Sequence, residues 1–240
     1  MSTKGVADIV FCLDASGSMN PCFDGVRNHV TAFVEGLRSS GQTSWDLRFD
    51  FVAHRCSGGG GPFRVEAESV FNRSLPEALY GPQPASKRFF TSDVDEIRRS
   101  LASVTTGGDE AALVGLDCAL DFPWRDAAAC HRVVIQMTDE PFETGAGPNE
   151  QKALLEDLIQ KIQDLRVMLF LVSPNSPIFR ELAQVDRSEW TIPDSAGQGL
   201  SRVDFQQVLA TMGKSVSASM LQGGPVRPVR RGLFGQVGWS

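Results

Sequence analysis

The chain has 240 residues, of which 42% are hydrophobic and 22% are charged. These values are ordinary for a globular protein, and the length suits one α/β domain with an insertion, or two small domains. The formal net charge is −6. Bulk electrostatics therefore gives no support for a nucleic-acid partner, and we predict none.

The five cysteines are odd in number and form no C-x-x-C motif. This pattern disfavours a disulfide framework or a zinc site, and it predicts reduced, mostly buried thiols. The N-terminal segment lacks the charged and then apolar regions of a signal peptide, and no apolar run approaches the roughly 20 residues of a membrane span. We therefore expect a cytoplasmic protein with no membrane partner.

The first elements alternate between strand and helix patterns. Val6–Leu13 is almost wholly apolar, which predicts a strand buried on both faces of a sheet. Apolar residues at helical spacing then predict an amphipathic helix over about 22–39. Segments 45–54 and 63–71 alternate apolar and polar residues, as half-buried strands do. The linker between them is too short for a helical crossover, so we predict an antiparallel hairpin at an edge of the sheet.

The segment 72–88 has three prolines and little periodicity, so we interpret it as an inserted loop. The repeated exchange of strand and helix patterns predicts an α/β fold, with a mostly parallel sheet and helices on both faces. Beyond 88, the patterns predict strands at 132–139, 167–173 and 189–193, and helices at 91–104, 110–120, 150–164, 176–186 and 202–220.

We predict a single domain over 1–222, with an insertion at about 57–88, and a separate tail over 223–240. The tail has three arginines and no acidic residue. Its composition fits either a flexible terminus or a segment that docks on an acidic or apolar surface of a partner or of another copy. The docking alternative assigns partner contacts to Arg227, Arg230, Arg231, Phe234 and Trp239.

Polar residues gather where the predicted strands end. Asp14, Ser16 and Ser18 follow the first strand at alternate positions, and we expect Gly17 to let the backbone turn. A second group lies in VTTGGDEAAL before the 110–120 helix, and Thr138-Asp139 ends the 132–139 strand. In an open α/β sheet these carboxyl ends meet at one rim, where ligands bind. A capped strand-to-helix turn is the structural alternative for the first group.

The potential ligand atoms of this set are hard oxygens from carboxylates and hydroxyls, and the set contains no Cys or His. Such a set selects Mg²⁺, Mn²⁺ or Ca²⁺ over zinc or copper. Because the serines are neutral, the site leaves a divalent cation electrophilic. We expect one coordination place to remain for an external carboxylate.

Catalysis is the competing interpretation, with Ser16 as a nucleophile. The histidines are His29 on the first helix, His54 at the end of the second strand and His131 at the start of the fourth strand. None is placed for a catalytic triad. Metal-assisted hydrolysis by Asp14 and Asp139 lacks an evident general base. We therefore predict that the protein is not an enzyme.

Three segments, DIVFCLDASGSM, TTGGDEAALVGLDCAL and RVVIQMTDEP, together resemble the von Willebrand factor type A (vWA) domain over roughly residues 5–220. The matching motif is the metal-ion-dependent adhesion site, D-x-S-x-S followed by T (or D/E) and then D. Carried over by position, Asp14, Ser16 and Ser18 match its first loop and Asp139 its third. The GGD-E form of the second segment resembles intracellular bacterial members rather than secreted adhesins.

The second loop departs from the pattern of this type. Relatives often read GGGD-x-P-E, but the Pro-Glu place is Ala111-Ala112 in this chain, so the usual carboxylate is missing. We expect Thr106 or Asp109 to take its role at the metal, and Thr105 is a further candidate.

The resemblance implies a Rossmann-like fold and a Mg²⁺-dependent binding module whose metal accepts a Glu or Asp from a partner protein. It also implies partners such as a MoxR-type AAA+ ATPase, a protease or an effector in a bacterial stress or defence system. The alternatives are a metal-dependent hydrolase on a similar fold, and a structural subunit with a vestigial site.

Overall fold

In this computed structural model, the described residues are 5–39, 44–56, 64–82, 88–193 and 198–221. They form a six-stranded sheet with strand order β3-β2-β1-β4-β5-β6. All neighbouring pairs are parallel except β2 and β3, which confirms the predicted α/β fold and its antiparallel edge hairpin. The strands are β1 (Gly5–Asp14), β2 (Trp45–Cys56), β3 (Val65–Glu68), β4 (His131–Met137), β5 (Val167–Val172) and β6 (Ser188–Thr191).

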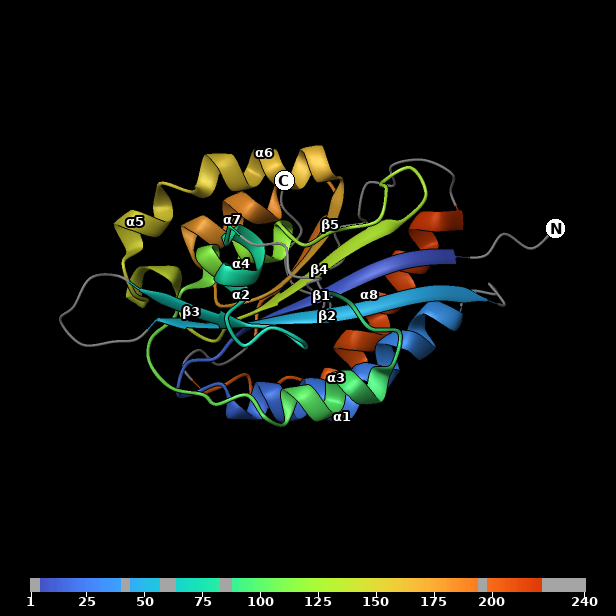
Figure 1. Cartoon of the computed structure of the whole chain (residues 1–240), viewed down its shortest axis with the longest axis horizontal. Coiled ribbons are helices and arrows are strands. Elements are labelled where there is room, and N and C mark those ends of the chain that lie inside the picture. Colours follow the sequence, from blue (N-terminus) through green and yellow to red (C-terminus); the bar gives the residue numbers. More distant parts are fainter. Residues whose placement is uncertain (1–4, 40–43, 57–63, 83–87, 194–197, 222–240) are drawn as a thin grey trace.

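Helices cover both faces of the sheet (Figure 1). One face carries α1 (Asn20–Arg38), α3 (Val94–Leu101) and α8 (Phe205–Leu221). The core on the other face includes residues of α2 (Leu75–Tyr80), α4 (Ala112–Leu120), α6 (Leu155–Leu165) and α7 (Pro177–Ala183). A 3₁₀ turn, η1 (Phe142–Thr144), and α5 (Pro148–Lys152) follow β4.

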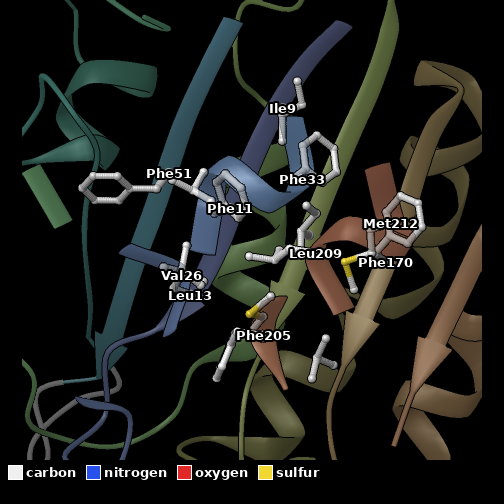
Figure 2. Close-up of a cluster of buried hydrophobic side chains, with 14 of the residues drawn as sticks. Ile9, Phe11, Leu13, Val26, Phe33, Phe51, Phe170, Phe205, Leu209 and Met212 are labelled. Atoms are coloured by element: carbon white, nitrogen blue, oxygen red, sulfur yellow. The ribbon is translucent and has the colours of Figure 1, made fainter. Parts of the chain in front are cut away.

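The central strand β1 explains why two helical layers are needed. Its odd-numbered residues Ile9, Phe11 and Leu13 belong to the core under α1 and α8, whereas Val10 and Cys12 belong to the opposite core. Because both sets are fully buried, the strand is almost wholly apolar between Val6 and Leu13, as predicted, with Asp8 as the exception. Figure 2 shows the first core, where the rings of Phe11 and Phe33 pack edge to face with centroids 6.4 Å apart.

Two predicted elements differ from the structure. The segment predicted as a loop over 72–88 contains α2, because Pro76 lies in the first turn, where a helix tolerates the missing N–H. The single helix predicted over 150–164 is two helices, α5 and α6. The break follows Lys152. The preceding residue, Gln151, has a buried side chain that accepts the Leu113 N–H and donates to Ala146 O instead of lying on an amphipathic surface.

All five cysteines are buried and free, as expected for reduced thiols. Within the described ranges, no helix has both the length and the apolar character needed to cross a membrane.

Candidate metal centre

The site lies where the strand order of the sheet reverses. The chain passes from β1 to β2 on one side, while β4 pairs with β1 on the other side. Asp14 is the last residue of β1, and Thr138-Asp139 follows β4 directly. The crevice outside the carboxyl ends of two such strands is the usual ligand site of an open α/β sheet.

Three carboxylates converge in this crevice. Asp14, Glu110 and Asp139 each offer an oxygen, and these oxygens lie within 4.8 Å of one another. Asp14 and Asp139 were predicted to meet here from their strand ends. Glu110 was missed by the sequence analysis.

The first loop folds back onto these carboxylates. The Ser16 backbone N–H donates to Asp14 Oδ1 at 2.8 Å, and the Ser18 hydroxyl donates to Asp139 Oδ1 at 3.0 Å. The hydroxyl oxygens of Ser16 and Ser18 lie 3.4 Å apart. All three predicted residues of this loop are therefore brought to one place, as the alternating spacing indicated.

The prediction for Gly17 is wrong. Among the described residues, Gly17 is not one of the glycines with a left-handed φ, and a Cβ built on it would meet no atom within 4 Å. The turn is closed instead by the Met19 N–H, which donates to Ser16 O at 3.2 Å. Gly17 is thus not required by the backbone of this loop.

The third loop and the segment before α8 fix the two aspartates from the other side. The Thr138 hydroxyl donates to Asp14 Oδ2 at 2.9 Å, and the Gly199 N–H donates to Asp139 Oδ2 at 2.5 Å. Gly199 has φ +61°, and a Cβ there would lie 2.0 Å from Ser18 O. Gly199 is therefore a supporting residue that carries no local sequence signal, because only the fold brings it to the site.

The second loop reaches the site through Glu110. The backbones of Asp109 and Cys56 form an antiparallel bridge with two hydrogen bonds of 3.0 and 2.8 Å. On the other side, Glu110 O accepts the Ala146 N–H at 3.0 Å. Because the backbone is held at both places, the Glu110 side chain faces Asp14 and Asp139. The expectation that this loop lacks its carboxylate is wrong, since Glu110 supplies one two residues before Ala112.

The other second-loop candidates make different contacts. The Thr106 hydroxyl donates to Asn20 Oδ1 at 2.9 Å, and Thr105 is exposed, with its carbonyl accepting from Arg55. The Asp109 side chain accepts the Glu110 backbone N–H at 3.3 Å. Ala111 and Ala112 are buried, so the positions that carry Pro and Glu in related loops face the interior.

The electrostatics of the cluster favours a cation. Burial raises the pKa of Asp14 to about 7, against the lowering effect of the Ser16 and Thr138 hydrogen bonds and with help from Asp139. Burial and the nearby carboxyl groups of Asp109 and Asp14 raise the pKa of Glu110 to about 8. A divalent cation would relieve both the desolvation and the repulsion. The carboxylate and hydroxyl oxygens fit Mg²⁺, Mn²⁺ or Ca²⁺.

Two histidines are poorly suited to activate Ser16. His54 is fully buried, burial lowers its pKa to about 3, and neither ring nitrogen has a hydrogen-bond partner among the described residues. His131 is the first residue of β4, at the rim opposite Asp139, and burial lowers its pKa to about 4.

The tail residues predicted to bind a partner, Arg227, Arg230, Arg231, Phe234 and Trp239, lie outside the described residues.

Comparison with solved structures identifies the fold. A protein from Catenulispora acidiphila described as von Willebrand factor type A matches 89% of the chain with a TM-score of 0.54 and 15% identity. The chain has the vWA fold. Proximal thread matrix protein 1 of the mussel byssus (TM-score 0.51, 16% identity, 89% of the chain) and the pilus adhesin SpaC of Lactobacillus rhamnosus GG in its open conformation (TM-score 0.51, 14% identity, 90% of the chain) match as well.

The vWA-fold chain spans less than half of each of these proteins, covering 43%, 48% and 30% of their lengths in the same order. No model of a known protein family matches the sequence, and no curated protein does. At these identities the likeness establishes the fold, as the sequence motifs predicted. The adhesion-site assignment and the intracellular bacterial type stay predictions.

Proposed function

We propose that the chain is a non-catalytic, metal-dependent protein-interaction module. The observation that carries this proposal is the convergence of Asp14, Glu110 and Asp139 within 4.8 Å at the strand-order reversal of a vWA fold. The Ser16 and Ser18 hydroxyls lie against the same carboxylates, so the donor set consists of oxygen alone. Mg²⁺ is the cation we propose, with Mn²⁺ or Ca²⁺ as the alternatives that the same oxygens accept.

The cation would be held by Asp14 and Asp139, by the hydroxyls of Ser16 and Ser18, and by the second loop through Glu110, with Thr106 and Asp109 as the further candidates from that loop. When bound, it supplies an electrophilic centre that accepts a carboxylate. The chain's own groups orient the site. Thr138 and Gly199 donate to the Oδ2 oxygens of the two aspartates, and their Oδ1 oxygens accept from Ser16 N–H and from the Ser18 hydroxyl.

The partner we propose is a protein that presents a Glu or Asp side chain. The resemblance of the motifs to intracellular bacterial members suggests a MoxR-type AAA+ ATPase, a protease or an effector in a cytoplasmic stress or defence system. In this proposal the tail over 223–240 adds a second contact with the same assembly. Deleting the tail should weaken assembly and leave the thermal unfolding of 1–222 unchanged.

Asp14→Asn tests the metal. The substitution removes one charge but keeps the side-chain size, so we expect Mg²⁺ affinity, measured by titration calorimetry, to fall by roughly 10–100-fold. Asp157→Asn, an exposed change on α6, is the matched control and should bind Mg²⁺ like the parent chain. Equal affinity in all three proteins would contradict the proposed site.

Partner capture and activity assays separate the remaining functions. Capture from the native host should be lost both with EDTA and with Asp14→Asn. Partner binding that survives both treatments would indicate a structural subunit. Phosphatase or nuclease turnover with Mn²⁺ that disappears in Asp14→Asn would indicate a hydrolase instead of an interaction module.

A further inference from the structure

The three carboxylates of the candidate metal centre are held in two different ways. Asp14 and Asp139 are both fully buried. Both oxygens of each carboxylate accept a hydrogen bond. The donors to Asp14 are Ser16 N–H and the Thr138 hydroxyl. The donors to Asp139 are the Ser18 hydroxyl and Gly199 N–H. Four donors therefore fix these two groups before any cation binds.

Glu110 has no comparable support. It is only partly buried, and its backbone N–H donates to Asp109 Oδ1 at 3.3 Å, a contact that holds the backbone of the residue and leaves its carboxylate free to rotate.

The movable part of Glu110 is its side chain and not its backbone. The bridge between Asp109 and Cys56, and the hydrogen bond from Ala146 N–H to Glu110 O, fix the loop on both sides of the residue. A glutamate on such a fixed backbone reaches or leaves the centre by rotation about its own side-chain bonds. No rearrangement of the sheet or of α4 is needed.

The position of the Glu110 side chain determines the net charge of the occupied metal centre. Asp14 and Asp139 together carry −2 when ionised and neutralise a divalent cation, whereas adding Glu110 gives 2 − 3 = −1 for the group of three carboxylates and one cation. A centre with a net negative charge repels a further carboxylate, and a neutral centre does not. Glu110 and a partner's carboxylate are therefore alternative ligands of one cation.

Resting on the metal-dependent function proposed above, we propose that Glu110 is an internal competitor that occupies the cation until a partner's Glu or Asp displaces it. The partner must then supply a carboxylate together with enough surrounding contact to outcompete a ligand tethered to the same chain. This selects protein partners with an extended interface over free carboxylic acids.

The experiment uses Mn²⁺ and acetate as probes of the full chain. Mn²⁺ affinity is measured by electron paramagnetic resonance, and acetate at the metal is measured by the paramagnetic relaxation of its methyl protons. Glu110→Gln keeps the size and removes the charge. We expect it to bind Mn²⁺ about tenfold more weakly and to show several-fold greater acetate relaxation per bound Mn²⁺ than the parent chain.

Two further variants keep the outcome interpretable. Glu110→Asp retains the charge but withdraws the carboxylate, so it should resemble Glu110→Gln even if the glutamine variant folds poorly. Glu143→Gln, at an exposed position in η1, should behave like the parent chain. Acetate relaxation that is unchanged in both Glu110 variants, with Mn²⁺ still bound, would overturn the internal competition and leave the metal site standing. Failure of the parent chain to bind Mn²⁺ would overturn the proposed function and this inference together.

Discussion

Asp139 illustrates how single residues position the candidate site. Its two oxygens accept hydrogen bonds from the Ser18 hydroxyl and from Gly199 N–H, which come from the first loop and from the segment before α8. Gly199 itself sits against Ser18 O and Pro21, where no side chain fits. The orientation of the carboxylate therefore depends on a residue that has no functional group.

Gly199→Ala tests this dependence. The new Cβ would lie 2.0 Å from Ser18 O and 2.7 Å from Pro21 Cδ, on a backbone with φ +61°. We expect the free energy of unfolding in urea to fall by about 1–3 kcal/mol. Gly17→Ala is the matched control, since a Cβ there meets nothing within 4 Å and should change stability by less than about 0.5 kcal/mol. A loss of the same size in both variants would show that the close approach of Gly199 is not the cause.

Sequence reasoning found the residues whose signal is local. Asp14, Ser16, Ser18 and Asp139 lie directly after apolar runs, and parallel pairing of β1 with β4 brings them together. Glu110 was missed because its orientation depends on the bridge between Asp109 and Cys56, residues far apart in the sequence. The only available signal was that Glu110 follows Asp109, and comparison with related loops directed attention to positions 111 and 112 instead.

At the scale of elements, the segment between β3 and α3 is joined to the sheet by one buried carboxylate. Asp50 of β2 accepts N–H groups from Phe51 at 2.9 Å and Val70 at 3.0 Å on one oxygen, and from Phe90 at 2.9 Å on the other. Val70 follows β3, and Phe90 precedes α3. This carboxylate therefore fixes both ends of the stretch that carries α2, even though burial raises its pKa to about 6.

Asp50→Asn should destabilise the fold by about 1–3 kcal/mol, because the amide places an N–H donor against a backbone N–H and leaves it unsatisfied. The measurement is urea unfolding at about pH 7.5, where the aspartate is ionised. Asp126→Asn serves as control, because Asp126 is exposed and its side chain accepts the Ala128 N–H, a role that an asparagine carbonyl can fill. Equal stability of the Asp50 variant and the parent chain would contradict this account of the segment.

Elements were predictable wherever apolar periodicity was continuous. The run Val6–Leu13 and the helical spacing in α1 and α8 gave the right structures, because burial on the faces of the sheet determines both. The segment 150–164 was wrongly predicted as one helix because Gln151 is polar, yet its amide is buried between Leu113 and Ala146. A pattern analysis based on hydrophobicity assigns glutamine to the surface, so it cannot predict that the Gln151 side chain is buried and hydrogen-bonded.

At the scale of the whole molecule, the protein concentrates buried negative charge at one end of its central strands. The fold places Asp14, Glu110 and Asp139 together, and their desolvation opposes ionisation of the folded chain. The stability of the domain and the occupancy of its metal site are therefore coupled through protons. This coupling gives a test of the site that needs no partner.

The sign of the pH dependence follows from the raised pKa values. Burial raises the pKa of Asp14 from 3.8 to about 7 and that of Glu110 from 4.5 to about 8. The folded chain thus retains protons that the unfolded chain releases. The stability from this protonation is fully present below about pH 4 and is lost as the pH rises through about 7 to 8. In EDTA, the free energy of unfolding should therefore fall between about pH 5 and about pH 8.

Mg²⁺ should reverse this trend, because it binds the ionised carboxylates and its binding releases their protons. At a free concentration about 100-fold above Kd, it adds about 2.7 kcal/mol, which raises Tm by roughly 5–10 °C for a chain of this size. We expect the difference in Tm between Mg²⁺ and EDTA, measured by calorimetry, to be small at about pH 5 and large at about pH 8. Asp50 does not belong to the cluster, so its titration affects both conditions equally and cancels in this difference. Asp14→Asn should remove most of the difference in Tm between Mg²⁺ and EDTA. A difference that is independent of pH in the parent chain would mean that these carboxylates do not ionise together around a cation.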